Sequence, residues 1–279
     1  MGEQMGSRDS ADDAQQQAER EMAKFDPAVT EQVAKYAGAL VKRYFRAEVR
    51  GLDNFPPTGA ALAVSNHSGG MLTPDVLVLA PEFYRKFGYG RPMYTLAHYG
   101  VVMGPIGDLL GRVGVIEASR ESAAKALHDG AVVLVFPGGD YDAYRPTFGA
   151  NIIDFSGRTG YVRTALEAGV PIVPVVSIGA QESQLFLTRG NWLAKRLGLT
   201  KARMDILPFS VGFPFGLSML IPPNLPLPSK IVTEVLEPID ITARFGDDPD
   251  ISEVDAHIRQ VMQTALDGLA RQRRLPILG

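Results

Sequence analysis

Cysteine is absent from this chain of 279 residues, which also contains only four histidines and one tryptophan. Without cysteine there are no disulfide bonds, no thiolate zinc sites and no cysteine nucleophiles, and the composition fits a reducing compartment. Four scattered histidines do not favour a zinc site either. We therefore expect no metal and no other cofactor.

Long apolar runs free of proline are also missing, so no stretch of about 20 residues predicts a membrane-spanning helix. The nearest approach is 206–229, which has no charged residue but has prolines at 208, 214, 222, 223, 226 and 228. Because proline breaks helices, we predict an apolar loop or strand system there. Residues 1–26 are polar and charged, so we predict a disordered or weakly helical tail and no signal peptide.

A strong excess of either charge is absent too, since 28 basic and 31 acidic residues give a formal net charge of −3. We therefore expect no nucleic-acid partner, because such proteins usually carry a basic excess. Common catalytic motifs are missing as well, namely G-x-S-x-G, G-x-x-x-x-G-K-[ST], G-x-G-x-x-G and H-E-x-x-H. A serine elbow, nucleotide hydrolysis and zinc chemistry have no support in the sequence.

What the sequence does contain is an alternation of short apolar runs and amphipathic stretches. The runs are typical of buried strands: Ala60–Val64, Val113–Ile116, Ala131–Phe136, Val170–Ile178 and Ile231–Leu236. Helices are predicted from Asp26-Pro27 onward with one apolar stripe, and over 119–127, 159–168 and 251–274. The pattern predicts one α/β domain over 27–279, with a mixed, mostly parallel sheet covered by helices.

Polar or glycine-bearing turns follow four of these strands, at 66–70, 114–120, 136–140 and 177–180. Ligands of open α/β sheets bind at the carboxyl ends of the strands, so we expect the four turns to share one edge. The first turn contains His67. A lone histidine in a loop is more often structural, but four such turns in register favour a functional site.

The order of these segments resembles the phospholipid/glycerol acyltransferase superfamily over roughly residues 45–240. V-x-G-L-x-N-F-P-x-x-G at 49–59 precedes an apolar run and Asn-His-Ser at 66–68. The family's second block, G-x-x-F-I-D-R, corresponds to 114–120, and its third, F-P-E-G, to 136–139. A proline-punctuated strand at 170–175 matches the fourth. The resemblance implies a fold like that of glycerol-3-phosphate and lysophosphatidate acyltransferases.

The resemblance implies transfer of a fatty acyl group from acyl-CoA or acyl carrier protein to a glycerolipid hydroxyl. His67 would be the general base and Asp75 the carboxylate that orients it. Histidine suits this role because its reference pKa of about 6.5 lies close to neutrality. Backbone N–H groups of the glycine-rich turns would stabilise the oxyanion. The implied substrate-binding residues are Asn66, Gly69, Gly70, Arg120, Phe136, Pro137, Gly138 and Gly139.

Two departures from the family pattern bear on this hypothesis. Seven residues separate His67 from Asp75, where the family usually has four, so the loop has to fold back; Asp75 also suits the N-cap of a helix at 76–80. Gly138 stands where phosphate-using relatives carry glutamate, which resembles the diacylglycerol acyltransferase-like branch with neutral acceptors. Arg120 favours a phosphate acceptor instead, unless it pairs with Glu117 or Glu121.

A basic patch lies just before the charge-free segment and surrounds Trp192 and Leu193: Arg189, Lys195, Arg196, Lys201 and Arg203. Basic residues beside a tryptophan suit an anionic bilayer, so we predict a cytoplasmic protein with peripheral membrane contact through 189–229. A solvated helix followed by a core-packing loop is the alternative. Two other functions stay open, namely a non-catalytic lipid carrier with the same fold and a thioesterase.

Overall fold

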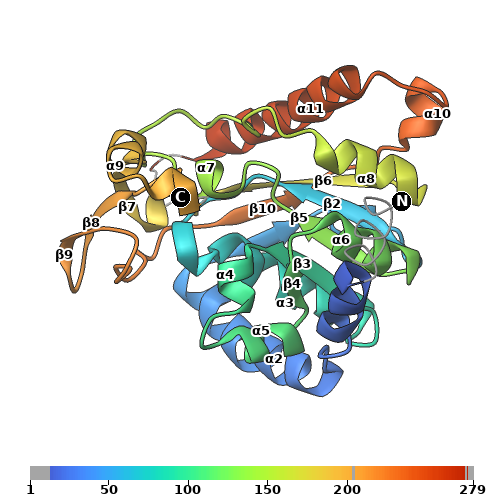
Figure 1. The fold of residues 1–279 in the computed structure, drawn as a ribbon, viewed down its shortest axis with the longest axis horizontal. Coiled ribbons are helices and arrows are strands. Elements are labelled where there is room, and N and C mark those ends of the chain that lie inside the picture. The colour runs from blue at the N-terminus through green and yellow to red at the C-terminus, as the bar shows by residue number, and fades with distance from the viewer. Residues whose placement is uncertain (1–12, 203–204, 274, 276–279) are drawn as a thin grey trace, which may run out of the picture.

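A seven-stranded mixed sheet forms the centre of the molecule (Figure 1), in the order β1-β10-β6-β2-β5-β3-β4. The computed structural model of the chain describes residues 13–202, 205–273 and 275. Strand pairing is parallel throughout this sheet except between β10 and β6. The strands are β1 (Glu48–Arg50), β2 (Ala61–Ser65), β3 (Met93–Ala97), β4 (Val115–Glu117), β5 (Val132–Val135), β6 (Ile172–Ile178) and β10 (Val232–Val235).

The central strands β6, β2 and β5 form where the sequence has continuous apolar runs. Every residue of β2 and of β6 is buried, which is the expected state of a strand covered by helices on both faces. The five predicted strands are confirmed, with ends that differ by one or two residues. Strand β3 was not predicted, because Met93–Ala97 mixes Tyr and Thr with apolar residues and follows a proline.

Helices cover both faces of the sheet. On one face lie α6 (Arg120–His128), α8 (Gly160–Ala168) and α11 (Ile251–Gln272), and on the other lies α3 (Pro74–Phe87), with α2 (Pro27–Tyr44) packed against it (Figure 1). Shorter helices are α4 (Tyr99–Val102), α5 (Gly107–Arg112), α7 (Gly139–Ala143), α9 (Asn191–Arg196) and α10 (Ile241–Phe245). The 3-10 turns are η1 (Leu52–Asn54), η2 (Gly70–Leu72), η3 (Gln181–Ser183) and η4 (Leu199–Ala202).

Helix α2 starts as predicted but presents an unexpected face to the protein. Asp26 caps it by accepting the N–H groups of the second and third residues after it. The middle of the predicted apolar stripe, however, is exposed, with Tyr36 at 69% and Leu40 at 68%, while Phe45 at its end is buried. The buried face carries small residues instead, including Ala34 and Gly38. Apolar periodicity shows which residues share a face but not what that face meets.

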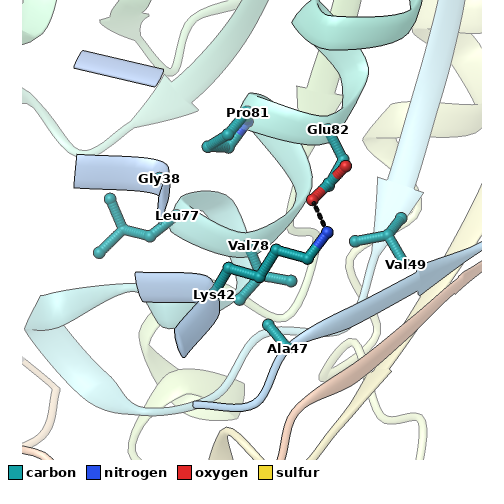
Figure 2. Close-up of a pocket in the computed structure, with 8 residues that line it drawn as sticks. All are labelled: Gly38, Lys42, Ala47, Val49, Leu77, Val78, Pro81 and Glu82. Carbon is teal, nitrogen blue, oxygen red and sulfur yellow. Dashed lines mark hydrogen bonds and ion pairs between the residues drawn. The ribbon is translucent and has the colours of Figure 1, made fainter. Parts of the chain in front are cut away.

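Small residues allow α2 to approach α3 closely, as Figure 2 shows. A Cβ atom added to Gly38 would lie 2.8 Å from the Cβ of Pro81. Beside this contact, Lys42 Nζ lies 2.8 Å from Glu82 Oε1, so the two helices are also joined by an ion pair (Figure 2). Gly38 therefore sets the spacing between the two helices.

Of the two states predicted for 1–26, disordered or weakly helical, the described part of the segment adopts the helical one. Residues 13–22 are helical, and the side chains of Ala18 and Glu21 are almost fully buried, at 0% and 3% exposed. Glu21 Oε2 accepts the backbone N–H of Glu117 in the edge strand β4, at 2.7 Å. One buried face and one carboxylate that satisfies a strand amide are enough to order a mostly polar segment. Residues 1–12 lie outside the described residues.

A second, three-stranded antiparallel sheet is formed by β7 (Leu185–Thr188), β8 (Phe209–Gly212) and β9 (Gly216–Ser218). The prediction of a strand or loop system in 206–229 is thus confirmed. Its connections expose large apolar side chains, among them Phe213 at 76% and Ile221 at 72%. Within 13–202 and 205–273, no helix is long and apolar enough to cross a membrane.

Candidate active site

Three of the four predicted turns meet at the carboxyl edge of the adjacent parallel strands β6, β2 and β5. His67 follows β2, and its ring lies on the ring of Phe136, which follows β5, with 4.3 Å between the ring centroids. Residues 177–180 end β6 on the other side. The fourth turn, which contains Arg120, ends β4, and β3 lies between β4 and β5.

His67 and Asp75 form a hydrogen-bonded pair. His67 Nδ1 lies 3.2 Å from Asp75 Oδ2, and the same oxygen accepts the backbone N–H of Ser68 at 2.7 Å. The histidine side chain is 13% exposed and the carboxylate 3%. A proton on Nδ1 that points at this carboxylate leaves the lone pair on Nε2, which is the atom that a general base uses.

Left-handed backbone residues fold the loop back between His67 and Asp75. Gly69 has φ = 82° and Gly70 has φ = 64°, values that glycine adopts without strain. A Cβ on Gly69 would lie 2.5 Å from the Pro74 ring, and one on Gly70 would lie 2.6 Å from a ring carbon of Phe186. Both positions therefore need glycine for conformation and for space.

Asp75 is not the N-cap that its position also suggested. Thr73 occupies the cap position of α3, with φ = 41°, and Asp75 is the second residue of the helix. The first turn of a helix favours a negative charge because its free N–H groups carry partial positive charge. Asp75 is thus held as the anionic partner of the histidine.

Known proteins that resemble this chain include members of an acyltransferase family and proteins named as lipid-synthesising enzymes. The sequence model of the Acyltransferase family matches residues 46–178. A Mycobacterium leprae protein is 31% identical over 263 residues, covering 90% of this chain and 67% of that protein. The Bos taurus protein named "DGAT1/2-independent enzyme synthesizing storage lipids" is 29% identical over 190 residues, covering 68% of this chain and 55% of that protein. The chain belongs to the phospholipid and glycerolipid acyltransferase superfamily.

A solved structure agrees with the superfamily fold. The crystal structure of the 1-acyl-sn-glycerophosphate (LPA) acyltransferase PlsC from Thermotoga maritima matches with a TM-score of 0.53 and 17% identity. The match covers 86% of this chain and 81% of that one, and at this identity it shows the shared fold. The chain spans 64% to 67% of the length of the mycobacterial proteins that it matches.

Asn66, predicted to bind substrate, joins two strand ends in this superfamily member. Its side-chain amide donates to Ser177 O at 2.9 Å, and its Oδ1 accepts from Ser177 N at 2.8 Å. The residue is 6% exposed. Both ends of the amide therefore hold the start of the His67 loop to the end of β6. A direct role in substrate binding stays a prediction.

Arg120 and Pro137 line one cavity of about 230 Å³ on the α6 and α8 side of the sheet. The cavity floor includes Leu62 and Val135, and Arg158 stands on its wall. Arg120 is exposed and forms no ion pair with any residue that the structure describes. The alternative interpretation, an exposed arginine at a helix start, agrees with its position as the first residue of α6, but the pairing with Glu117 or Glu121 is not among the ion pairs of the described residues. His67 does not line this cavity, so the predicted site residues fall on two sides of the 136–140 turn.

Space requires glycine at position 138, and the positive φ favours it at position 139, where only the mobile end of the Arg158 side chain lies close. A Cβ on Gly138 would lie 2.6 Å from Asp142 Cβ, and one on Gly139, where φ is 51°, would lie 2.6 Å from Arg158 Nη1. Arg158 also donates to Gly138 O at 3.0 Å and pairs with Asp140 at 3.2 Å. The glutamate that phosphate-using relatives carry at position 138 does not fit unless α7 moves.

Asp142 is the site residue that the sequence did not reveal. Its Oδ2 accepts the backbone N–H of His67 at 2.7 Å, and its Oδ1 pairs with Arg145. The side chain is fully buried, and this burial raises the pKa of Asp142 above its usual value. No motif marks this position, because its role depends on a contact with a loop that precedes it by 75 residues.

The basic patch is only partly free. Arg189 Nε donates to Tyr141 O at 2.7 Å, and its guanidinium lies 3.9 Å from the Tyr141 ring centroid, so Arg189 is fixed to α7. Trp192 of α9 is 62% exposed. Arg203 lies outside the described residues. In the part of the chain that the structure describes, no three His, Asp or Glu side chains lie close enough to hold a metal ion.

Proposed function

We propose that this chain transfers a fatty acyl group from a thioester, acyl-CoA or acyl carrier protein, to a hydroxyl group of a glycerolipid. The observation that carries the proposal is the hydrogen-bonded pair of His67 and Asp75 at the junction of three strand ends. Support comes from the superfamily membership and from relatives whose names describe lipid synthesis.

In the proposed mechanism, His67 Nε2 takes the proton of the acceptor hydroxyl as its oxygen attacks the thioester carbonyl. The tetrahedral intermediate then collapses, the C–S bond breaks, and the imidazolium returns the proton to the leaving thiolate. Asp75 stabilises the imidazolium between these steps. A positioned base of this kind contributes roughly 10²–10⁴-fold to the rate. The reaction involves no change of oxidation state and needs no cofactor.

The oxyanion of the intermediate requires backbone or side-chain donors. The N–H groups of His67 and Ser68 already donate to Asp142 and Asp75, so they are not available. We assign this role to the amides of Gly69 and Gly70, which follow directly in the same loop.

Arg120 is the residue that would meet the head group of an anionic glycerolipid acceptor. Among the described residues the Arg120 guanidinium has no ion-pair partner, and it lines a largely apolar cavity, which suits an anionic group on an apolar chain. Gly138 supports the neutral-acceptor branch instead. Acceptor charge is therefore the property that an assay has to resolve.

We further propose peripheral membrane contact on the cytoplasmic side through 189–229. Exposed apolar side chains in this segment support it, with Phe213, Ile221 and Trp192 each more than half exposed. The exposed stripe of α2 adjoins this segment, because Tyr44 OH donates to Pro226 O. Apolar side chains at an interface gain free energy by leaving water.

The test is a thiol-release assay with acyl-CoA and acyl carrier protein over a panel of acceptors: glycerol 3-phosphate, lysophosphatidate, monoacylglycerol and diacylglycerol. We expect release that depends on one acceptor, and its loss in a folded His67→Ala variant. Equal release of free fatty acid with and without acceptor would favour a thioesterase. Co-purified lipid with no thioester consumption would favour a lipid carrier.

A further inference from the structure

Two successive backbone amides of the His67 loop are held by two carboxylates from different helices. His67 N donates to Asp142 Oδ2 in α7, and Ser68 N donates to Asp75 Oδ2 in α3, each at 2.7 Å. Asp75 also contacts the histidine ring, whereas Asp142 holds only its backbone. The loop is therefore fixed from both sides at the residue that carries the base.

Asp142 is costly to bury and is not explained by stability. Its side chain is fully buried, and the side chain of Arg145, its ion-pair partner, is 12% exposed. Removing two charges from water costs about as much as their attraction returns, so buried pairs of this kind add little stability. Such a group is retained where its position has a use, and its nearest backbone neighbour is His67.

Gly138 and Asp142 share one space. A Cβ at position 138 would overlap Asp142 Cβ at 2.6 Å and would also lie 3.0 Å from Asp154 O. Gly138 has φ = −66° and ψ = −24°, which any residue adopts, so space alone requires glycine here. The departure from F-P-E-G to F-P-G-G thus makes room for the Asp142 carboxylate beside the His67 loop.

We propose that Asp142 is a positioning residue for His67, admitted by Gly138 and paired with Arg145. The proposal rests on the proposed function, since it assigns to Asp142 the placement of the general base. Asp142 fixes the backbone of His67, and its charge stabilises the imidazolium that forms during acyl transfer. The charged groups that face His67 are Asp75 from α3 and Asp142 with Arg145 from α7.

The test compares Asp142→Asn with Asp142→Ala. Asparagine keeps an acceptor for His67 N but removes the charge, so we expect the acid limb of the kcat/KM profile to move to lower pH, with KM unchanged. Alanine removes the acceptor as well, and misplacing the base by about 1 Å costs roughly 10²-fold in kcat. The control is Asp255→Asn on α11, another buried aspartate paired with an arginine, which should keep the wild-type pH profile.

Gly138→Ala supplies an independent arm. It should lower kcat as Asp142→Ala does, and the double variant should be no slower than either single variant, because both disrupt the same contact. If the two losses of kcat added up in the double variant, they would contradict the claim that residue 138 and Asp142 compete for one space. Circular dichroism establishes that each variant is folded, and if Asp142→Ala does not fold, the asparagine variant decides.

Proton NMR titration of the His67 ring, assigned with His67→Ala, separates this inference from the proposed function. A titration midpoint at lower pH in Asp142→Asn supports the inference even if no acceptor gives acyl transfer. An unchanged midpoint together with an unchanged acid limb overturns it, while acyl transfer by the wild type would still stand.

Discussion

The imidazole of His67 and the carboxylate of Asp75 lie within hydrogen-bond distance, 3.2 Å from Nδ1 to Oδ2, although seven residues separate them in the chain. Three left-handed residues, Gly69, Gly70 and Thr73, bring the chain back onto itself between them. The longer gap is thus compatible with the histidine–aspartate pair, because the left-handed residues fold the loop back and bring the two side chains within hydrogen-bond distance.

Replacing Asp75 by asparagine should lower kcat for acyl transfer by roughly 10²–10⁴-fold. The amide no longer stabilises the imidazolium and does not fix the tautomer with the proton on Nδ1. Thioester consumption with the best acceptor measures the effect. Asp53→Asn is the control, since the Asp53 side chain is 93% exposed and pairs with Lys86 at the surface. Wild-type turnover by a folded Asp75→Asn protein would contradict the proposed mechanism.

Arg120→Met should separate charged from neutral acceptors. If the acceptor carries a phosphate, we expect KM for it to rise tenfold or more, because a charge-assisted hydrogen bond contributes about 1.5–3 kcal/mol. KM for diacylglycerol should stay as in the wild type. Arg163→Met is the control, because Arg163 is an exposed arginine of α8. Equal KM values for phosphorylated acceptors in both variants would remove Arg120 from the acceptor site.

Phe213→Ser combined with Ile221→Ser should weaken binding to vesicles of anionic phospholipid. Each large apolar side chain gains about 1.5–3 kcal/mol on leaving water, so the double variant should bind at least tenfold more weakly. Vesicle co-sedimentation measures this. Ile152→Ser is the control, because Ile152 is also an exposed apolar residue, at 50%. It lies outside 189–229, next to Ile153, whose backbone N–H donates to Gln263 of α11. An equal loss of vesicle binding in the Phe213/Ile221 double variant and in Ile152→Ser would count against membrane contact through 189–229.

Two glycines in long helices should respond to substitution with opposite signs. Gly38→Val forces α2 away from Pro81, and overpacking of this kind costs about 1–3 kcal/mol of unfolding free energy. Gly268→Ala in α11 meets no atom closer than 3.9 Å, and the gain in helix propensity stabilises by about 0.5–1 kcal/mol. Urea unfolding measures both, and a destabilised Gly268→Ala protein would contradict the assignment of open space there.

The charge of Asp142 should make stability depend on pH in a defined direction. Burial raises its pKa in the folded protein, so as pH rises through 3.8, the value for an unperturbed carboxyl, the unfolded chain ionises first. The free energy of unfolding of the wild type should therefore fall relative to that of Asp142→Asn until the native carboxyl also ionises, and the difference should then stay constant. Urea unfolding between pH 3.5 and 8 measures this difference. If the free energy of unfolding of the wild type instead rose relative to that of Asp142→Asn, the pKa of Asp142 would be lowered in the folded protein, contrary to the prediction.

The sheet was predictable from the sequence because its central strands are covered on both faces. Such strands are continuous apolar runs, as in Ala61–Ser65 and Ile172–Ile178, and they need no periodicity to be recognised. The polar turns meet at one edge because the strands they follow are parallel, so that their carboxyl ends lie on the same side of the sheet. The prediction that His67 and the 136–140 turn share one edge is therefore confirmed by the contact between the His67 and Phe136 rings.

Other parts depend on contacts that a sequence pattern does not contain. The stripe of α2 has ordinary helical periodicity, yet Gly38 and Ala34 face the protein because α3 presents a proline at that point. Asp142 was missed for a related reason: an aspartate in a short polar helix is usually solvated. Only the fold reveals that its carboxylate meets the amide of His67.

Asn66 and Ser177 are 111 residues apart, and two hydrogen bonds between them join the start of the His67 loop to the end of β6. A chain that ends before Ser177 contains His67, Asp75 and Asp142 but lacks this clamp. During synthesis the His67 loop thus gains its final form only after β6 has left the ribosome. The proposed acyl transfer would therefore depend on assembly of the sheet as far as β6, and it would serve as a readout of that assembly.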